Sequence, residues 1–267
     1  MGRAQEGTVA VFSLEQGLGG TALIIPPKEL RVRVGPFDDA DVFLASGHQT
    51  VELAKRMTRV SSSSDILDIG CGCGRFALAV ADILEDGTYV GLDPDREHIN
   101  WCNETIASRN GRFRFYHLDI DAPPYNERGR VRPEEVELPV SGPFDIVILS
   151  SVLTHMMPTA ITHYLLKLTG LLESDGQCLL SALLLNDEAK QAIREGRTDF
   201  KFVHALGSCC WALDRENPLE GVAMEEEWFL ERLGANGLVL DRLHYGTWRD
   251  VKGVAIEHYW MTVSRAR

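Results

Sequence analysis

The stretch from Asp65 to Arg75, D-I-L-D-I-G-C-G-C-G-R, constrains the fold of this chain more than any other feature. A short apolar run ends abruptly in alternating glycines, and a second apolar run follows at residues 76–84. This pattern predicts a buried strand, a glycine turn and a helix. Glycine allows positive φ and close approach of the backbone to a ligand, and a helix N-terminus favours phosphate-like groups. The pattern therefore predicts a nucleotide-like ligand, with a tight turn that binds nothing as the alternative.

The spacing of the glycines separates two nucleotide-binding families. The dinucleotide fingerprint G-x-G-x-x-G requires glycine at position 75, where this chain has arginine. The chain instead has D-x-G-x-G-x-G, which resembles motif I of the class I S-adenosylmethionine-dependent methyltransferases. The resemblance covers about residues 45–265 and implies S-adenosylmethionine as cofactor and S-adenosylhomocysteine as product. It also implies a first set of cofactor-binding residues: Asp68, which would reach the methionyl ammonium, and Gly70, Cys71, Gly72 and Gly74.

Strand and helix patterns alternate after this motif. We expect strands at residues 66–69, 89–92, 113–118, 144–149, 177–185, 238–244 and 255–263. We expect helices at residues 47–60, 76–84, 96–107, 159–172, 187–196 and 225–233, and an irregular stretch at residues 200–217. The alternation predicts an α/β fold with a mostly parallel sheet. The resemblance implies a Rossmann-like, doubly wound sheet of seven strands with an antiparallel late hairpin and helices on both faces.

Two parts of the chain differ from this pattern. Residues 1–45, of which residues 1–30 are weakly patterned, are interpreted as an N-terminal extension with a lid as its candidate role. Residues 46–267 are expected to form the methyltransferase domain. An insertion at about residues 186–222 is expected to form the acceptor pocket, as is common in the family.

Asp93 is the strongest candidate outside the glycine motif. It lies 23 residues after Gly70, at the end of the second predicted strand, and Pro94 follows it. A carboxylate at this point can accept hydrogen bonds from both hydroxyls of a ribose. This position also serves nicotinamide cofactors, so Asp93 predicts an adenosine ligand without naming it. An ordinary aspartate at the end of a strand is the alternative.

The resemblance implies further contacts at the ends of the third and fourth strands. In the family, an acidic residue at the end of the third strand binds the adenine amino group. We assign this role to Asp119, with Asp121 as the alternative. The backbone N–H of Ile120 would contact the adenine ring. Ser150 follows the fourth predicted strand and would lie beside the sulfonium.

His155, in the stretch S-V-L-T-H-M, is the candidate general base. An imidazole with a pKa of about 6.5 can take a proton from a hydroxyl as the methyl group transfers. A core or helix-capping histidine is the alternative role. The spacing of the histidines and cysteines is not typical of a metal site, so no metal is expected.

The predicted reaction is methyl transfer to an oxygen, with nitrogen as second choice, of a small-molecule acceptor such as a sugar or secondary metabolite. Two other classes remain open: a nicotinamide-dependent oxidoreductase, which predicts glycine at 75, and a non-catalytic cofactor-binding module. The net charge of −12 argues against nucleic acids and anionic membranes as partners. The sequence has no pattern of a secretory leader and no apolar run that approaches ~18 residues. Its six cysteines show no disulfide pattern, so a cytoplasmic protein is expected. A homodimer is one candidate assembly.

Overall fold

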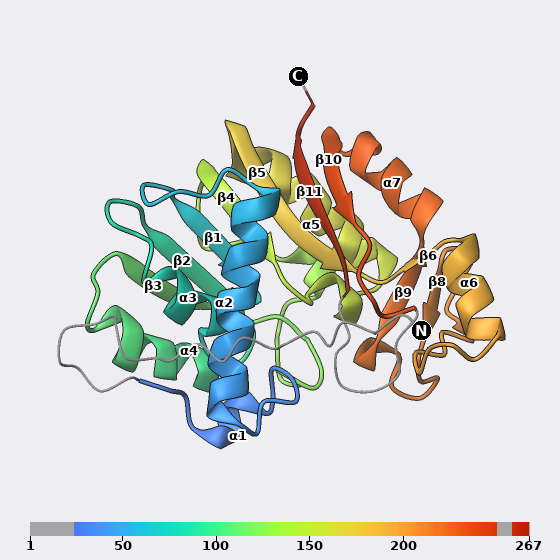
Figure 1. The fold of residues 1–267 in the computed structure, drawn as a ribbon, viewed down its shortest axis with the longest axis horizontal. Helices are drawn as coiled ribbons and strands as arrows, with labels where there is room; N and C mark the ends of the chain where they lie inside the picture. The colour runs from blue at the N-terminus through green and yellow to red at the C-terminus, as the bar shows by residue number, and fades with distance from the viewer. Residues whose placement is uncertain (1–23, 250–257, 267) are drawn as a thin grey trace, which may run out of the picture.

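The computed structural model describes residues 24–249 and 258–266, and a central sheet organises them (Figure 1). In the described chain this sheet has seven strands in the order β10-β11-β5-β4-β1-β2-β3. They are β1 (Ile66–Ile69), β2 (Tyr89–Asp93), β3 (Phe113–His117), β4 (Phe144–Leu149), β5 (Leu172–Ala182), β10 (Leu238–His244) and β11 (Tyr259–Arg265). Strands β1 to β5 are parallel, whereas β11 is antiparallel to both β5 and β10. The predicted Rossmann-like α/β class is confirmed.

The central strands are apolar because both faces of the sheet are covered. All four residues of β1 are buried, and Ile66 pairs with Tyr89 of β2 and Ile146 of β4. A parallel sheet needs helices on both faces, so its strands are continuous apolar runs rather than alternating ones. This is why the short run before the glycines identifies a buried strand.

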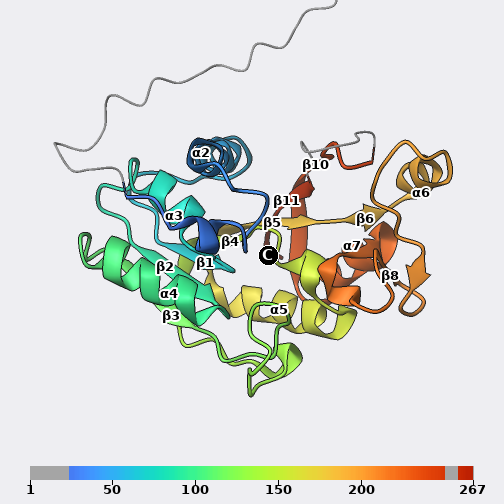
Figure 2. The ribbon, with the colours of Figure 1, turned by 90° about the horizontal axis from the view of Figure 1, so that it is seen from below.

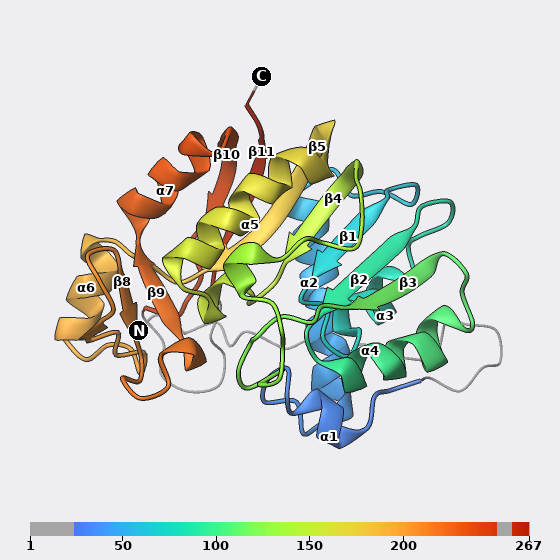
Figure 3. The same ribbon diagram turned by 180° about the vertical axis from the view of Figure 1, so that it is seen from behind.

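Helices cover both faces of the sheet (Figure 2). One face packs against α2 (Ala40–Met57), α3 (Arg75–Val80) and α4 (Arg96–Cys102), which share a single apolar cluster. The other face packs against α5 (Pro158–Leu171) and α7 (Glu226–Ala235), as Figure 3 shows from behind. A π-helical turn, Asn103–Ala107, extends α4 and completes the predicted helix at residues 96–107.

Helix α2 begins seven residues before the expected start at residue 47. Its N-cap is Asp39, whose Oδ1 accepts hydrogen bonds from the N–H groups of Asp41 and Val42, at 2.8 and 3.1 Å. Such a cap satisfies N–H groups that have no partner within the helix. The expected domain boundary at residues 45/46 therefore falls inside a continuous helix. Before α2, residues 28–31 form the short helix α1 (Lys28–Arg31).

A second, smaller sheet corrects the expectation of an irregular stretch at residues 200–217. Within the described residues it has four strands in the order β6-β9-β8-β7, namely β6 (Leu184–Leu185), β9 (Val222–Glu225), β8 (Cys210–Ala212) and β7 (His204–Ala205). Helix α6 (Asp187–Arg194) lies beside it at the end of the molecule next to β10 and β11 (Figure 1). Strands of two or three residues are too short to show a periodic pattern in the sequence.

Two strand boundaries also differ from the prediction. β5 begins at Leu172 rather than at residue 177, directly after α5. The last strand begins at Tyr259, and residues 255–257 of the expected strand lie outside the described residues. In the part of the chain that is described, no helix is both long and apolar enough to cross a membrane.

Candidate active site

A cleft opens at the carboxyl ends of the parallel strands. Its walls carry residues that follow β1, β2, β3 and β4, and it holds about 1190 Å³ of empty space, part of it open to solvent. The chain runs from β1 outward to β2 and β3, and then returns to place β4 on the other side of β1. Ligands of open α/β sheets bind where the strand order reverses in this way. The cleft is therefore the candidate active site.

The glycine turn forms one wall of this cleft. Gly70 and Gly72 have φ values of 82° and 54°, in the region that favours glycine, and a Cβ on Gly72 would lie 2.6 Å from Val34 Cγ1. The N–H groups of Gly70 and Cys71 donate to the Leu92 carbonyl oxygen at 2.7 and 3.0 Å. These contacts fix the turn against β2, and all three turn residues line the cleft.

Gly74 has a different role from the other two glycines. It is the N-cap of α3 with φ of 80°, and a Cβ there would lie 2.7 Å from Ile106 Cδ1. It is not among the residues that line the cleft and packs against the helix that follows β2, so its expected cofactor contact stays a prediction.

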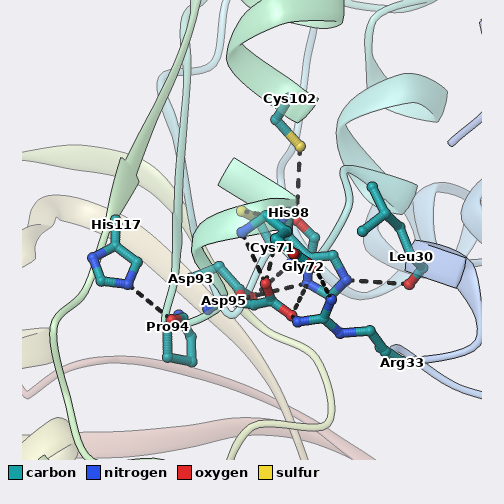
Figure 4. A network of polar contacts seen from close by, with 11 residues as sticks. Leu30, Arg33, Cys71, Gly72, Asp93, Pro94, Asp95, His98, Cys102 and His117 are labelled. Carbon is teal, nitrogen blue, oxygen red and sulfur yellow. Dashed lines mark hydrogen bonds and ion pairs between the residues drawn. The ribbon is translucent and has the colours of Figure 1, made fainter. Parts of the chain in front are cut away.

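Asp93 ends β2 and is held in place by backbone donors (Figure 4). Its Oδ2 accepts from the Gly72 N–H and its Oδ1 from the Asp95 N–H, both at 2.8 Å. The side chain is buried, and both Asp93 and Pro94 line the cleft. Each carboxylate oxygen keeps further acceptor capacity, which suits two neighbouring hydroxyls.

His98 of α4 is a cleft residue that the sequence did not reveal. Its Nε2 donates to the Leu30 carbonyl oxygen at 3.1 Å. Its buried Nδ1 has no hydrogen-bond partner in the described chain, and lies 3.4 Å from Asp95 Oδ2 and 3.6 Å from Asp93 Oδ1 (Figure 4). A buried polar atom without a partner at a cleft wall is a feature of ligand sites. A lone histidine in a helical pattern carries no signal that would have identified it.

The N-terminal segment is tied to the same corner of the cleft. Arg33 forms ion pairs with Asp95 and Glu97 beside α4, as Figure 4 shows for Asp95. Val34 lines the cleft and packs against Gly72. Residues 28–34 therefore cover the end of β2.

Asp68 and Arg75 place opposite charges deep in the cleft. Burial raises the pKa of Asp68 to about 7, while the Tyr89 hydroxyl, which donates to it at 2.5 Å, and the charge of Arg75 lower it. Burial lowers the pKa of Arg75, whose Nη1 donates to Ser46 Oγ at 3.2 Å and whose guanidinium lies 5.2 Å from the Phe37 ring centroid. A buried carboxyl group near a half-buried guanidinium suits the zwitterionic end of an amino acid.

The loop after β3 contributes Ile120 and Asp121 to the cleft, but not Asp119. Asp119 accepts a hydrogen bond from Arg130 Nε at 2.5 Å, and this contact lowers the pKa of its carboxyl. The preference for Asp119 over Asp121 is therefore not supported by the lining of the cleft. The physical reason is that β3 ends at His117, and a bridge between Ile120 and Val131 turns Asp119 toward Arg130.

His155 lines the opposite wall, on a single 3-10 turn (Leu153–His155) that follows β4. Its Nδ1 donates to the Leu219 carbonyl oxygen at 2.8 Å, so the neutral ring carries its lone pair on Nε2. Burial lowers the pKa of His155, which keeps the ring neutral near pH 7. The Tyr125 ring meets it edge-on at 5.9 Å.

Further residues of this wall are Ser150, Ser151, Val152, Met156, Tyr164 and Leu219. Ser150 was predicted, whereas Leu219 is the described contribution of residues 186–222 to the cleft. In the described chain, no group of three or more His, Cys, Asp or Glu side chains is arranged to hold a metal ion. The predicted absence of a metal stays a prediction.

Comparisons with known proteins agree with this geometry. Residues 67–178 match the methyltransferase domain family. A protein of Invertebrate iridescent virus 6, by name a methyltransferase, 235L, is 30% identical over 50 residues, 19% of this chain and 19% of that protein. The chain thus matches about a fifth of the length of this curated relative.

Solved structures share the fold across most of the chain. The 1,6-didemethyltoxoflavin-N1-methyltransferase of Burkholderia thailandensis, with bound 1,6-didemethyltoxoflavin and S-adenosylhomocysteine, is 17% identical with a TM-score of 0.50 and covers 84% of this chain and 79% of its own. The mitomycin 7-O-methyltransferase MmcR is 15% identical with a TM-score of 0.56, covering 86% of this chain and 56% of its own. The [4+2]-cyclase SpnF is 14% identical with a TM-score of 0.51, covering 82% of this chain and 80% of its own.

The fold, the cleft at the strand-order reversal and the glycine turn define a nucleotide-binding α/β protein. Together with the family match, they indicate a methyltransferase domain at residues 67–178.

Proposed function

We propose that this protein transfers a methyl group from S-adenosylmethionine to a hydroxyl oxygen of a small-molecule acceptor. The proposal rests on the orientation of His155: its Nδ1 donates to the Leu219 carbonyl oxygen, which leaves the lone pair of Nε2 to accept a proton. It lines the same cleft as the glycine turn and Asp93. A base with a fixed tautomer beside a cofactor site suits removal of a hydroxyl proton.

The residues of the cleft fit the cofactor from end to end. The two oxygens of Asp93 would accept the ribose hydroxyls, and the orphaned Nδ1 of His98 lies at the same corner. Asp68 and Arg75 would hold the ammonium and carboxylate of the methionyl end. Adenine would lie against Leu118 and Ile120, with Asp121 rather than Asp119 accepting from its amino group; this replaces the choice made from the sequence.

The bound cofactor supplies a methyl group on a positively charged sulfur: the acceptor oxygen bonds to the methyl carbon as the carbon–sulfur bond breaks, and that electron pair stays on sulfur. The protein positions the acceptor, shields the reacting atoms from water and accepts the hydroxyl proton on His155 Nε2. Because the pKa of His155 is lowered by burial, its base form is available across neutral pH.

The walls around His155 favour an acceptor with a flat apolar body. Tyr125, Met156, Tyr164 and Leu219 line the cleft together with His155, and the Tyr125 ring meets the imidazole edge-on. Aromatic and aliphatic walls with few polar groups bind rings through their faces and edges. We therefore place a hydroxylated aromatic compound ahead of a sugar as the acceptor. We further propose that residues 28–34 act as the lid expected from the sequence, through Arg33 and Val34.

The first test is calorimetric titration with S-adenosylhomocysteine and, separately, with NADH. Binding of S-adenosylhomocysteine alone is expected, and binding of NADH alone would favour the oxidoreductase. Because a protein named as a [4+2]-cyclase shares this fold, binding must be followed by a turnover assay. S-adenosylhomocysteine production is measured with catechol, 1-naphthol, 8-hydroxyquinoline and methyl β-glucoside. Cofactor binding without methylation of any acceptor would support the non-catalytic binding module.

A further inference from the structure

Ser151, at the end of β4, has an unusual backbone. Its φ is 59°, and it is the one non-glycine residue of the described chain with a positive φ. Side chains with a Cβ rarely occupy this left-handed region, which glycine enters freely. A serine held there at the wall of a cleft indicates that its side chain is needed, because strained residues cluster at functional sites.

Three contacts hold Ser151 in this conformation. Its N–H donates to Ser181 Oγ of β5 at 2.8 Å, and its carbonyl oxygen accepts from Thr154 Oγ1 at 3.1 Å. Its own hydroxyl lies 3.2 Å from Nδ1 of His258, which directly precedes β11. The backbone N–H, the carbonyl oxygen and the hydroxyl of Ser151 thus each contact a different segment of the chain.

His258 is well suited to orient a hydroxyl and poorly suited to take its proton. Burial, the protonated form of His155 and the charge of Arg75 lower the pKa of His258 to about 4, so the ring is neutral near pH 7. In either neutral tautomer the contact with Nδ1 uses one hydrogen-bonding direction of the Ser151 hydroxyl. The remaining directions are left for a ligand.

We propose that Ser151 is a catalytic residue whose hydroxyl contacts the reacting oxygen of the acceptor, and that His258 is a positioning residue that fixes the direction of this hydroxyl. The inference rests on the proposed methyl transfer. Ser151 lies two residues before the 3-10 turn that carries His155, and both residues line the cleft, so together they would hold the acceptor oxygen at two points. The acceptor proton passes to His155, and Ser151 exchanges no proton. Two contacts to the acceptor oxygen align one of its lone pairs with the methyl group, whereas a single contact leaves the acceptor free to rotate.

The first experiment separates function from stability at Ser151. Ser151→Gly removes the hydroxyl but suits the left-handed backbone, so Tm is expected to rise by about 2 °C. Ser151→Ala removes the hydroxyl and keeps the strain. With the acceptor that the wild type turns over fastest in the four-compound panel, both variants should lower kcat at least tenfold. The Kd for S-adenosylhomocysteine should stay within twofold of the wild-type value.

The second experiment tests the positioning role of His258. His258→Asn keeps a polar side-chain atom near the place of Nδ1 and should retain most of kcat, whereas His258→Phe should match the loss of Ser151→Ala. If the two residues act as one unit, the double variant Ser151→Ala/His258→Phe loses no more than either single variant. Additive losses would overturn the pairing.

The outcomes distinguish this inference from the function on which it rests. An active wild type with an unchanged kcat in Ser151→Gly would overturn the role of Ser151 and leave methyl transfer intact. A change in the Kd for S-adenosylhomocysteine without a change in kcat would make Ser151 a cofactor contact instead. A wild type that binds S-adenosylhomocysteine but methylates none of the four acceptors would overturn the proposed function itself.

Discussion

The two halves of the cleft are built in different ways. The half that suits the cofactor comes mainly from one continuous stretch, in which Asp68, Gly72, Asp93 and His98 lie within about one β-α-β unit. The half around His155 draws Tyr125, Leu219 and His258 from segments far apart in the chain. One half is local in sequence and the other is assembled by tertiary packing.

The contacts that hold each half differ as well. Backbone N–H groups fix the carboxylate of Asp93, so its position follows from the path of the main chain. His155 is fixed by one hydrogen bond to the distant Leu219, and Ser151 by side chains of Ser181 and His258. Substitutions in the cofactor half should therefore raise the Kd for S-adenosylhomocysteine, whereas substitutions in the other half should lower kcat.

The largest expected effect is on the pH dependence of stability through Asp68. Because burial raises the pKa of its carboxyl from 3.8 to about 7, the folded state holds a proton between these values that the unfolded state has released. The stabilisation is thus complete below pH 3.8 and is lost as pH rises through 7, by up to about 4 kcal/mol. In Asp68→Asn this loss should disappear. Urea unfolding at pH 4 to 8 measures it, and parallel curves for the two proteins would contradict it.

The next largest effect is on cofactor affinity at Asp93. Asp93→Ala removes the proposed ribose acceptor and should weaken S-adenosylhomocysteine binding by about 3 kcal/mol, roughly a hundredfold. Asp119→Ala is the matched control, because Asp119 follows the neighbouring strand but does not line the cleft. Calorimetry should give the control a Kd within about twofold of the wild type. Equal losses in both variants would restore Asp119 as a cofactor residue.

His155→Gln should lower kcat by about a hundredfold and leave the Kd for S-adenosylhomocysteine unchanged. The pH profile sharpens this test. Since burial lowers the pKa of His155 below its usual value of 6.5, wild-type kcat should already be level above about pH 6.5. In the variant kcat should keep rising with pH, because the acceptor must then ionise by itself. A level profile in both proteins would exclude His155 as the base.

The smallest effect is expected at Arg33. Its ion pairs with Asp95 and Glu97 tie the N-terminal segment to the corner of the cleft that carries Asp93, but the side chain is partly exposed and its charge is screened. Arg33→Ala should weaken S-adenosylhomocysteine binding two- to threefold, about 0.5 kcal/mol, and less at high salt. Lys28→Ala, which removes a surface pair with Asp38 in the same segment, is the control and should have no effect. Identical Kd values for all three proteins would argue against a lid role.

The same division explains how much the sequence could predict. The glycine turn and Asp93 were identified because each is defined by its spacing along one strand-turn-helix unit. Asp119 was preferred over Asp121 because strand ends are uncertain by a residue or two, and the bridge at Ile120 decides which side chain faces the cleft. Ser151 and His258 lie 107 positions apart, and their contact has no periodic or motif signal. The second sheet was missed for the same reason, since its short strands pair across distant positions.

The second sheet also has a consequence for how such a protein diversifies. Between β6 and β9 the chain makes an excursion through α6, β7 and β8, and the two ends of this excursion pair, with Leu184 beside Met224 and Leu185 beside Glu225. Because the two ends of this excursion meet, lengthening or replacing it carries a small entropic cost of closure. The excursion delivers the Leu219 carbonyl that orients His155, yet it contributes nothing to the Gly72–Asp93 hydrogen bond. Under the proposed function, a change in this excursion would therefore alter the acceptor side of the cleft and leave the hydrogen bond that fixes Asp93 in place.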